Sequence, residues 1–259
     1  MALHNTYDAR LFHQETAAGA GAQLLLLALL GTAIGMGPAG WLTGVAFALA
    51  TWAVLNRALR RSQPRAFGPA NRVTLGRSIL VGAVTALVAD SFESSPPITL
   101  FVGLTAVALI LDGVDGKVAR RTGTASALGA RFDMEVDAFL ILVLSVYVSM
   151  SLGPWVLAIG LMRYAFVAAA RVLPWLNGEL PPSMARKTVA AFQGILLLVA
   201  ASGLFPYAVT LGAVTLALGS LAWSFGRDVR WLWTVRGSEQ PVPSEDRPRE
   251  QIRHMANAR

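Results

Sequence analysis

Four aspartates stand close together near the middle of the sequence, between two strongly apolar segments. They are Asp112, Asp115, Asp133 and Asp137, in the stretch DGVDGKVARRTGTASALGARFDMEVD. Carboxylates at the ends of membrane-type helices are costly and are usually functional. Several carboxylates in a low dielectric repel one another, and a hard divalent cation with oxygen ligands relieves that repulsion. The sequence therefore predicts a site for one or two metal ions.

The spacing of the polar and small residues in this stretch fits two helices that face each other. Residues three, four, seven and eight apart lie on one side of a helix. One face of the first helix would carry Asp112, Asp115, Gly116, Ala119 and Arg120. One face of the second would carry Ser126, Gly129, Asp133 and Asp137. A short turn around Gly123 would set the two faces opposite each other.

The same stretch resembles the signature of the CDP-alcohol phosphatidyltransferase family, Asp-x2-Asp-Gly-x2-Ala-Arg-x8-Gly-x3-Asp-x3-Asp. The chain has all its fixed positions, namely Asp112, Asp115, Gly116, Ala119, Arg120, Gly129, Asp133 and Asp137. A pattern of this length is far more specific than a lone glycine motif. The alternative, helix ends whose acids are merely solvated or ion-paired, would require every position to match by chance. The resemblance implies an enzyme that transfers a lipid phosphoryl group from a CDP-linked donor to an alcohol and releases CMP.

The resemblance also implies roles for individual residues. Asp112, Asp115 and Asp133 bind divalent metal, Mg²⁺ or Mn²⁺, with two ions expected. Asp137 is placed as the general base for the acceptor hydroxyl and as a further metal ligand. The implied contacts of the CDP-lipid are Asn71, Thr74, Gly116, Ala119, Arg120, Ser126 and Gly129, of which Ser126 lies outside the fixed motif.

A second element of the family resemblance lies upstream. Residues 69–77, PANRVTLGR, are similar to the Pro-Asn-x-x-Thr-x-x-Arg element that opens the catalytic core in many relatives. An alanine separates Pro69 from the asparagine, so only Asn71, Thr74 and Arg77 are carried over. The simpler alternative is a helix start capped by Asn71 with basic residues beside it.

Composition places the chain in a membrane. Hydrophobic residues make up 54% and charged residues 14% of the sequence, which is outside the range of soluble domains. There is no cysteine, so disulfides and thiol chemistry are excluded. The net charge of +7 comes from basic residues set between apolar runs, which favours an anionic lipid surface over nucleic acid as a partner.

Eight apolar segments indicate an all-α integral membrane protein, a bundle of about eight transmembrane helices. Two of them form an N-terminal hairpin turning at Gly37 and Pro38, and six form the catalytic core. We expect the polar N-terminus and hairpin to occupy residues 1–62, the core 63–236, and a disordered tail 237–259. The segments lie at about 17–36, 39–56, 72–90, 97–111, 136–152, 154–175, 188–205 and 207–225, the fourth continuing as a helix that carries Asp112 and Asp115.

The positions of the basic residues predict the orientation. All 22 lysines and arginines fall on one side, which also holds both termini and the aspartates: they are Arg10 and the basic residues of segments 57–77, 117–131, 163–187 and 227–259. Positive residues accumulate in the cytoplasm, so both termini and the site should be cytoplasmic, in the inner or plasma membrane.

A basic group follows the aspartates along the chain, comprising Arg163, Arg171, Arg186 and Lys187. It fits a pocket for a phosphate on the acceptor alcohol, as in relatives that use glycerol phosphate or inositol phosphate. Equally, Arg163 could belong to an internal ion pair, and the others to ordinary cytoplasmic positive charge. Glu135 points away from the aspartate face and has no expected catalytic role.

The leading hypothesis is a transferase that uses CDP-diacylglycerol and an alcohol, and the resemblance implies that it pairs as a homodimer. One alternative is an aspartate-rich membrane prenyltransferase, a class that usually separates its two acid motifs by several spans. Another is an ion transporter, whose carboxylates should lie near the middle of the bilayer. Here the aspartates fall within 112–137, at a predicted connection.

Overall fold

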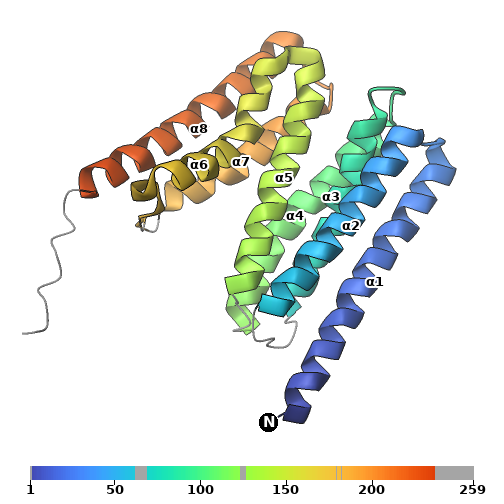
Figure 1. Ribbon diagram of the computed structural model, residues 1–259. Coiled ribbons are helices and arrows are strands. Elements are labelled where there is room, and N and C mark those ends of the chain that lie inside the picture. The colour runs from blue at the N-terminus through green and yellow to red at the C-terminus, as the bar shows by residue number, and fades with distance from the viewer. Residues whose placement is uncertain (1, 62–68, 123–126, 179, 182, 237–259) are drawn as a thin grey trace, which may run out of the picture.

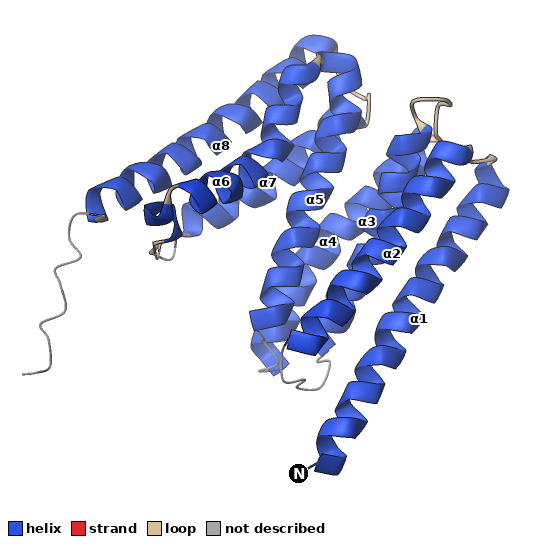
Figure 2. Cartoon of the chain, in the orientation of Figure 1, coloured by secondary structure: helices blue, strands red, loops and turns tan. Residues whose placement is uncertain are grey.

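The computed structural model describes residues 2–61, 69–122, 127–178, 180–181 and 183–236, and all the regular structure in them is helical (Figure 2). Side chains are described in these ranges except at 2–13, 59–61, 69–70, 115–122 and 127–128. The long helices are α1 (Ala2–Ile34), α2 (Pro38–Arg61), α3 (Pro69–Asp90), α4 (Ile98–Thr122), α5 (Ala127–Leu152), α6 (Leu157–Val172), α7 (Met184–Ala201) and α8 (Tyr207–Val235). Two short 3₁₀ helices, η1 (Pro154–Val156) and η2 (Pro174–Asn177), flank α6.

The described helices have the length and composition of membrane spans. Seven of them are long and apolar enough to cross a bilayer, and α4 adds a shorter apolar helix, Ile98–Val114. Large apolar side chains such as Leu42, Val172 and Leu204 are more than 70% exposed, which suits a surface covered by lipid. The predicted helical membrane bundle, a hairpin followed by six further helices, is confirmed.

The helices extend beyond the predicted apolar segments. Helix α1 begins at Ala2, α5 at Ala127 and α8 ends at Val235, each about ten residues or more outside the hydropathy limits. Hydropathy marks only the part of a helix that lies in hydrocarbon, whereas backbone hydrogen bonding continues into polar sequence. For α5 the extension matters, because it places Asp133 in the same helix as Asp137. The predicted tail, 237–259, lies outside the described residues.

Helices α3 and α5 form the centre of the bundle. Two thirds of the α3 span, 67%, is buried inside the protein. Helix α5 packs against α3 on one side and against α6 and α7 on the other (Figure 1). Their shared core contains Val84, Leu140 and Leu144, and Phe101 of α4 stacks on Tyr147 of α5 with ring centroids 4.4 Å apart. This packing fixes the helices that carry the aspartates and the arginine described next.

Candidate active site

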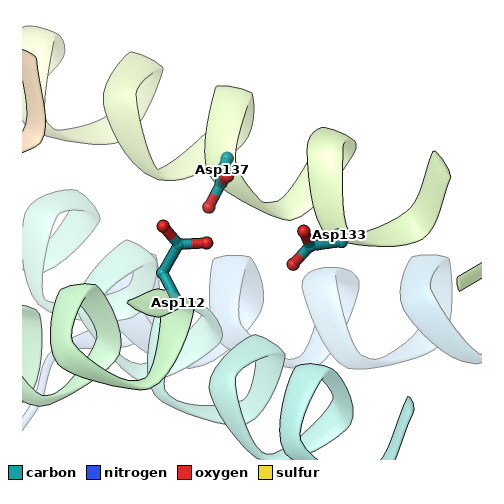
Figure 3. Close-up of side chains that lie close together, drawn as sticks. All are labelled: Asp112, Asp133 and Asp137. Carbon is teal, nitrogen blue, oxygen red and sulfur yellow. The ribbon is translucent and has the colours of Figure 1, made fainter. Parts of the chain in front are cut away.

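Three of the predicted aspartates converge between α4 and α5. Asp112 comes from α4, whereas Asp133 and Asp137 lie one turn apart on α5, and the three carboxylates point toward one another (Figure 3). One carboxylate oxygen from each lies within 4.8 Å of the others. Their side chains are 37%, 34% and 44% exposed, so the group is open to a ligand. The predicted arrangement of two facing helices therefore brings carboxylates from both halves of the motif together.

Arg77 of α3 reaches into this group from the protein interior. Its side chain is only 1% exposed. The guanidinium donates to Asp112 through Nη1, and through Nη2 to Asp133 Oδ1 at 2.5 Å and to the Asp133 carbonyl at 3.1 Å. The same Nη2 lies 3.1 Å from Asp137 Oδ1. A buried arginine needs anionic partners, and this one finds them on two other helices.

The donor set suits a hard divalent cation. All three groups offer carboxylate oxygens, the ligand type that Mg²⁺ and Mn²⁺ prefer. Among the described side chains around the group, three carboxylates face one guanidinium, which leaves an excess of negative charge. The oxygens lie within 4.8 Å of one another, and two ligands of one ion are separated by at most about twice the metal–oxygen distance of about 2.0–2.6 Å. The residues present therefore fit a metal.

Two of the predicted CDP contacts lie on the first turns of α3. Asn71, Thr74 and Arg77 are three residues apart, so they follow one side of the helix. Thr74 is 4% exposed and Asn71 is partly exposed. Gly129, at the start of α5, lies one turn before Asp133 and is also partly exposed.

The remaining motif positions are only partly described. Asp115, Gly116, Ala119 and Arg120 lie in α4, after Asp112, but their side chains fall outside the described residues. Ser126 lies outside them altogether. Helical continuation places Asp115 one turn beyond Asp112, on the same side of α4. Its role as a metal ligand stays a prediction.

The basic group divides into paired residues and residues without a described acidic partner. Arg163 of α6 donates from Nη2 to Glu135 Oε1 of α5 at 2.5 Å, which is the internal ion pair considered from the sequence. Arg186 of α7 donates to Asp228 Oδ2 of α8 at 3.3 Å and to the Pro181 carbonyl at 2.5 Å. For Arg171 and Lys187 the described acidic side chains provide no ion pair. Glu135 thus has a structural partner on the side of α5 away from the aspartates.

Sequence reasoning assigned no role to two residues that the structure places at charged sites. The sequence placed Arg77 in the upstream element only, yet Arg77 contacts the three motif aspartates whose side chains are described. An arginine inside an apolar span already signals an anionic partner, although that signal does not say which acid provides it. Asp228 accepts from its neighbour Arg227 and from Arg186, and nothing in the local sequence indicates the contact with Arg186.

Comparison with known proteins agrees with the motif. A family model described as CDP-alcohol phosphatidyltransferase matches residues 67–224, more than half of the chain. Neither the search of curated proteins nor that of solved structures found a match. The matched segment begins just before α3 and includes Arg77 and all four aspartates. The match favours a CDP-alcohol phosphotransferase over the prenyltransferase and transporter alternatives.

Proposed function

The chain belongs to the CDP-alcohol phosphatidyltransferase family, and we propose that it transfers the phosphatidyl group of CDP-diacylglycerol to an alcohol acceptor. Membership makes it a membrane phosphotransferase of phospholipid biosynthesis. The observation that carries the finer assignment is the convergence of Asp112, Asp133 and Asp137 from two helices. A partly exposed cluster of carboxylates between two membrane helices suits a diphosphate whose lipid tails remain in the bilayer.

The reaction exchanges one phosphorus–oxygen bond for another. The acceptor oxygen bonds to the phosphatidyl phosphorus, and the bond from that phosphorus to the bridging oxygen breaks, so that its electrons leave with CMP. Asp137 takes the proton of the acceptor hydroxyl. It is the most exposed of the three carboxylates, at 44%, so a hydroxyl can reach it. Asn71, Thr74, Gly116, Ala119, Arg120, Ser126 and Gly129 are proposed to contact the CDP-lipid.

Asp112, Asp133 and, by the family pattern, Asp115 would hold Mg²⁺ or Mn²⁺, with Asp137 as a further ligand of a two-ion site. Such ions, when bound, supply positive charge for the diphosphate oxygens and the leaving CMP. The protein's own contribution is to hold the carboxylates in register. Arg77 does this by bridging α3 to Asp112 on α4 and to Asp133 and Asp137 on α5.

We propose that the acceptor carries a phosphate, as glycerol phosphate or inositol phosphate does. The candidates for binding it are Arg163, Arg171, Arg186 and Lys187. Arg186 shares the single carboxylate of Asp228 with Arg227, so positive charge is in surplus there. A phosphate monoester matches arginine in geometry and charge, whereas a zwitterion such as serine needs fewer cations.

The remaining assignments concern placement in the cell. We propose an enzyme of the inner or plasma membrane whose active site and both termini face the cytoplasm, because all 22 basic residues fall on that side of the predicted topology. We also propose a homodimer, on the strength of family membership alone.

An acceptor panel tests the proposal. The purified protein in detergent, with Mg²⁺ or Mn²⁺, is given CDP-diacylglycerol and a set of alcohols, and CMP and the lipid product are measured. We expect CMP release with a phosphorylated acceptor and none in Asp112→Ala, with Glu93→Ala, an exposed acid beyond the far end of α3, as the matched active control. Undiminished CMP release by Asp112→Ala would contradict the metal assignment. Preference for serine or an uncharged alcohol would contradict the acceptor class.

A further inference from the structure

The N-terminal hairpin, α1 and α2, precedes the segment that the family model matches. It nevertheless packs along α3, the helix that carries Arg77 (Figure 1). We propose that the hairpin is a positioning element of the active site. It sets the register of α3 against α5, and thereby the place of Arg77 among the carboxylates. The inference concerns contacts within this chain and takes the aspartate group as the metal site proposed above.

Both hairpin helices meet α3 at one glycine. Gly82 lies five residues after Arg77, and a Cβ built there would be 2.0 Å from Gln23 Nε2 of α1 and 2.6 Å from Phe47 Cδ1 of α2. Real Cβ atoms essentially never come so close to another atom. Gln23 is 3% exposed, so its amide is held against the α3 backbone in the interior. A side chain at position 82 would therefore have to displace Gln23 of α1 or Phe47 of α2, so this glycine lets both hairpin side chains approach the α3 backbone closely.

Phe47 continues this contact to the second helix of the site. Its ring lies 5.3 Å, centroid to centroid, from Phe139 of α5. Phe139 follows Asp137 by two residues. One hairpin side chain therefore touches both the helix that supplies Arg77 and the helix that supplies Asp133 and Asp137. Moving that side chain changes the spacing between the two helices.

Polar contacts hold α3 to the hairpin at both ends. Near the aspartates, Arg72 donates from Nε and Nη2 to Glu15 Oε1 of α1, at 3.0 and 2.5 Å. At the far end, the backbone N–H of Gly37 donates to Asp90 Oδ1 at 2.6 Å, and Asp90 is 2% exposed. With contacts at both ends, a change in packing at the middle of α3 bends the helix sideways there rather than sliding it along its axis. A displacement near 1 Å is enough to cost on the order of 10²-fold in rate.

The test removes the bridging ring from the full-length protein. Phe47→Ala should lower kcat about tenfold with KM for CDP-diacylglycerol within about twofold, because the reacting groups and not the lipid contacts are displaced. Without substrate, Phe47→Ala should also bind Mn²⁺ severalfold more tightly, because the Arg77 guanidinium moves away from the carboxylates. Electron paramagnetic resonance of the free Mn²⁺ measures this binding. Phe166→Ala is the matched control, since it removes one ring of the Phe166–Phe225 pair between α6 and α8, away from the hairpin.

A double-mutant cycle separates positioning from general stability. If the hairpin acts through Arg77, Phe47→Ala should add little to the loss already caused by Arg77→Gln. The proposal would be overturned if the kcat losses of Phe47→Ala and Arg77→Gln multiplied in the double variant. It would also be overturned if Phe47→Ala lowered kcat no more than Phe166→Ala does. Phe47→Leu, which keeps the apolar volume, serves if the alanine variant fails to fold. Absence of Mn²⁺ binding in the unaltered protein would refute the metal assignment and not the role of the hairpin. The kcat values of the two single variants and the double variant would still test that role.

Discussion

Two charged regions of the molecule differ in the sign of their unbalanced charge. At the aspartate group, the described carboxylates of Asp112, Asp133 and Asp137 share the guanidinium of Arg77. Between α7 and α8 the ratio is reversed, because Arg186 and Arg227 share the carboxylate of Asp228. Surplus negative charge attracts a metal cation, and surplus positive charge attracts a phosphate. The difference predicts which ligand each region takes and how each should respond to neutralisation.

The largest expected effect comes from neutralising one member of the acidic group. Asp137→Asn keeps the size of the side chain but removes the proposed base, so kcat should fall by about 10²–10⁴-fold. Binding of CDP-diacylglycerol should persist, because the other carboxylates and the α3 residues remain. Equilibrium binding of a labelled CDP-lipid alongside kcat checks both statements. Near-normal turnover would refute the base role, and loss of CDP-lipid binding would make Asp137 chiefly a binding residue.

Removing the arginine from the acidic group should lower turnover less than Asp137→Asn does, and it should strengthen metal binding. Arg77→Gln leaves three carboxylates without their guanidinium, so Mn²⁺ should bind severalfold more tightly. Turnover should nevertheless fall about 10–100-fold, because the link from α3 to Asp112, Asp133 and Asp137 is lost. Weaker Mn²⁺ binding in Arg77→Gln would show that the arginine's organisation of the carboxylates outweighs its repulsion of the ion. Arg230→Gln, an exposed arginine of α8, is the control.

The sequence was most informative about the acidic region. A fixed motif between two apolar segments is local in the chain, and helical periodicity then places Asp112 opposite Asp133 and Asp137. The fold class follows from hydropathy for the same reason, since membrane helices are continuous segments. Hydropathy did not give the helix limits, because α1 and α5 continue into polar sequence where hydrogen bonding no longer depends on apolarity.

Contacts between distant segments were not predictable in this way. Arg77 meets Asp133 across 56 residues, and Arg186 meets Asp228 across 42. An unmatched arginine in an apolar span indicates that a partner exists, but not which acid supplies it. Arg163 shows the same limit, because the sequence left an ion pair and an acceptor contact equally open. The packing of α5 against α6 identified Glu135 as its partner.

The basic region should respond through the acceptor. Arg186→Ala should raise KM for a phosphorylated acceptor about tenfold, with KM for CDP-diacylglycerol and kcat changed little, because the lost contact belongs to acceptor binding. A tenfold change corresponds to about 1.4 kcal/mol, close to the lower limit for a hydrogen bond to a charged group. Arg230→Ala provides a matched loss of positive charge on α8. An equal rise in both KM values would show that Arg186 supports the fold through Asp228 rather than the acceptor.

The smallest expected effect decides between the two interpretations of Arg163. Its guanidinium pairs with Glu135, whose side chain is 58% exposed, so solvent weakens the attraction. If Arg163 also binds the acceptor phosphate, the two anions compete for it, and Glu135→Gln should lower the acceptor KM about two- to threefold. The substitution keeps the side-chain volume, and Glu93→Gln gives the same chemical change at an exposed position away from α6. An unchanged acceptor KM, with only a small drop in thermal stability, would assign Arg163 to the structural ion pair and leave Arg171, Arg186 and Lys187 as the phosphate-binding candidates.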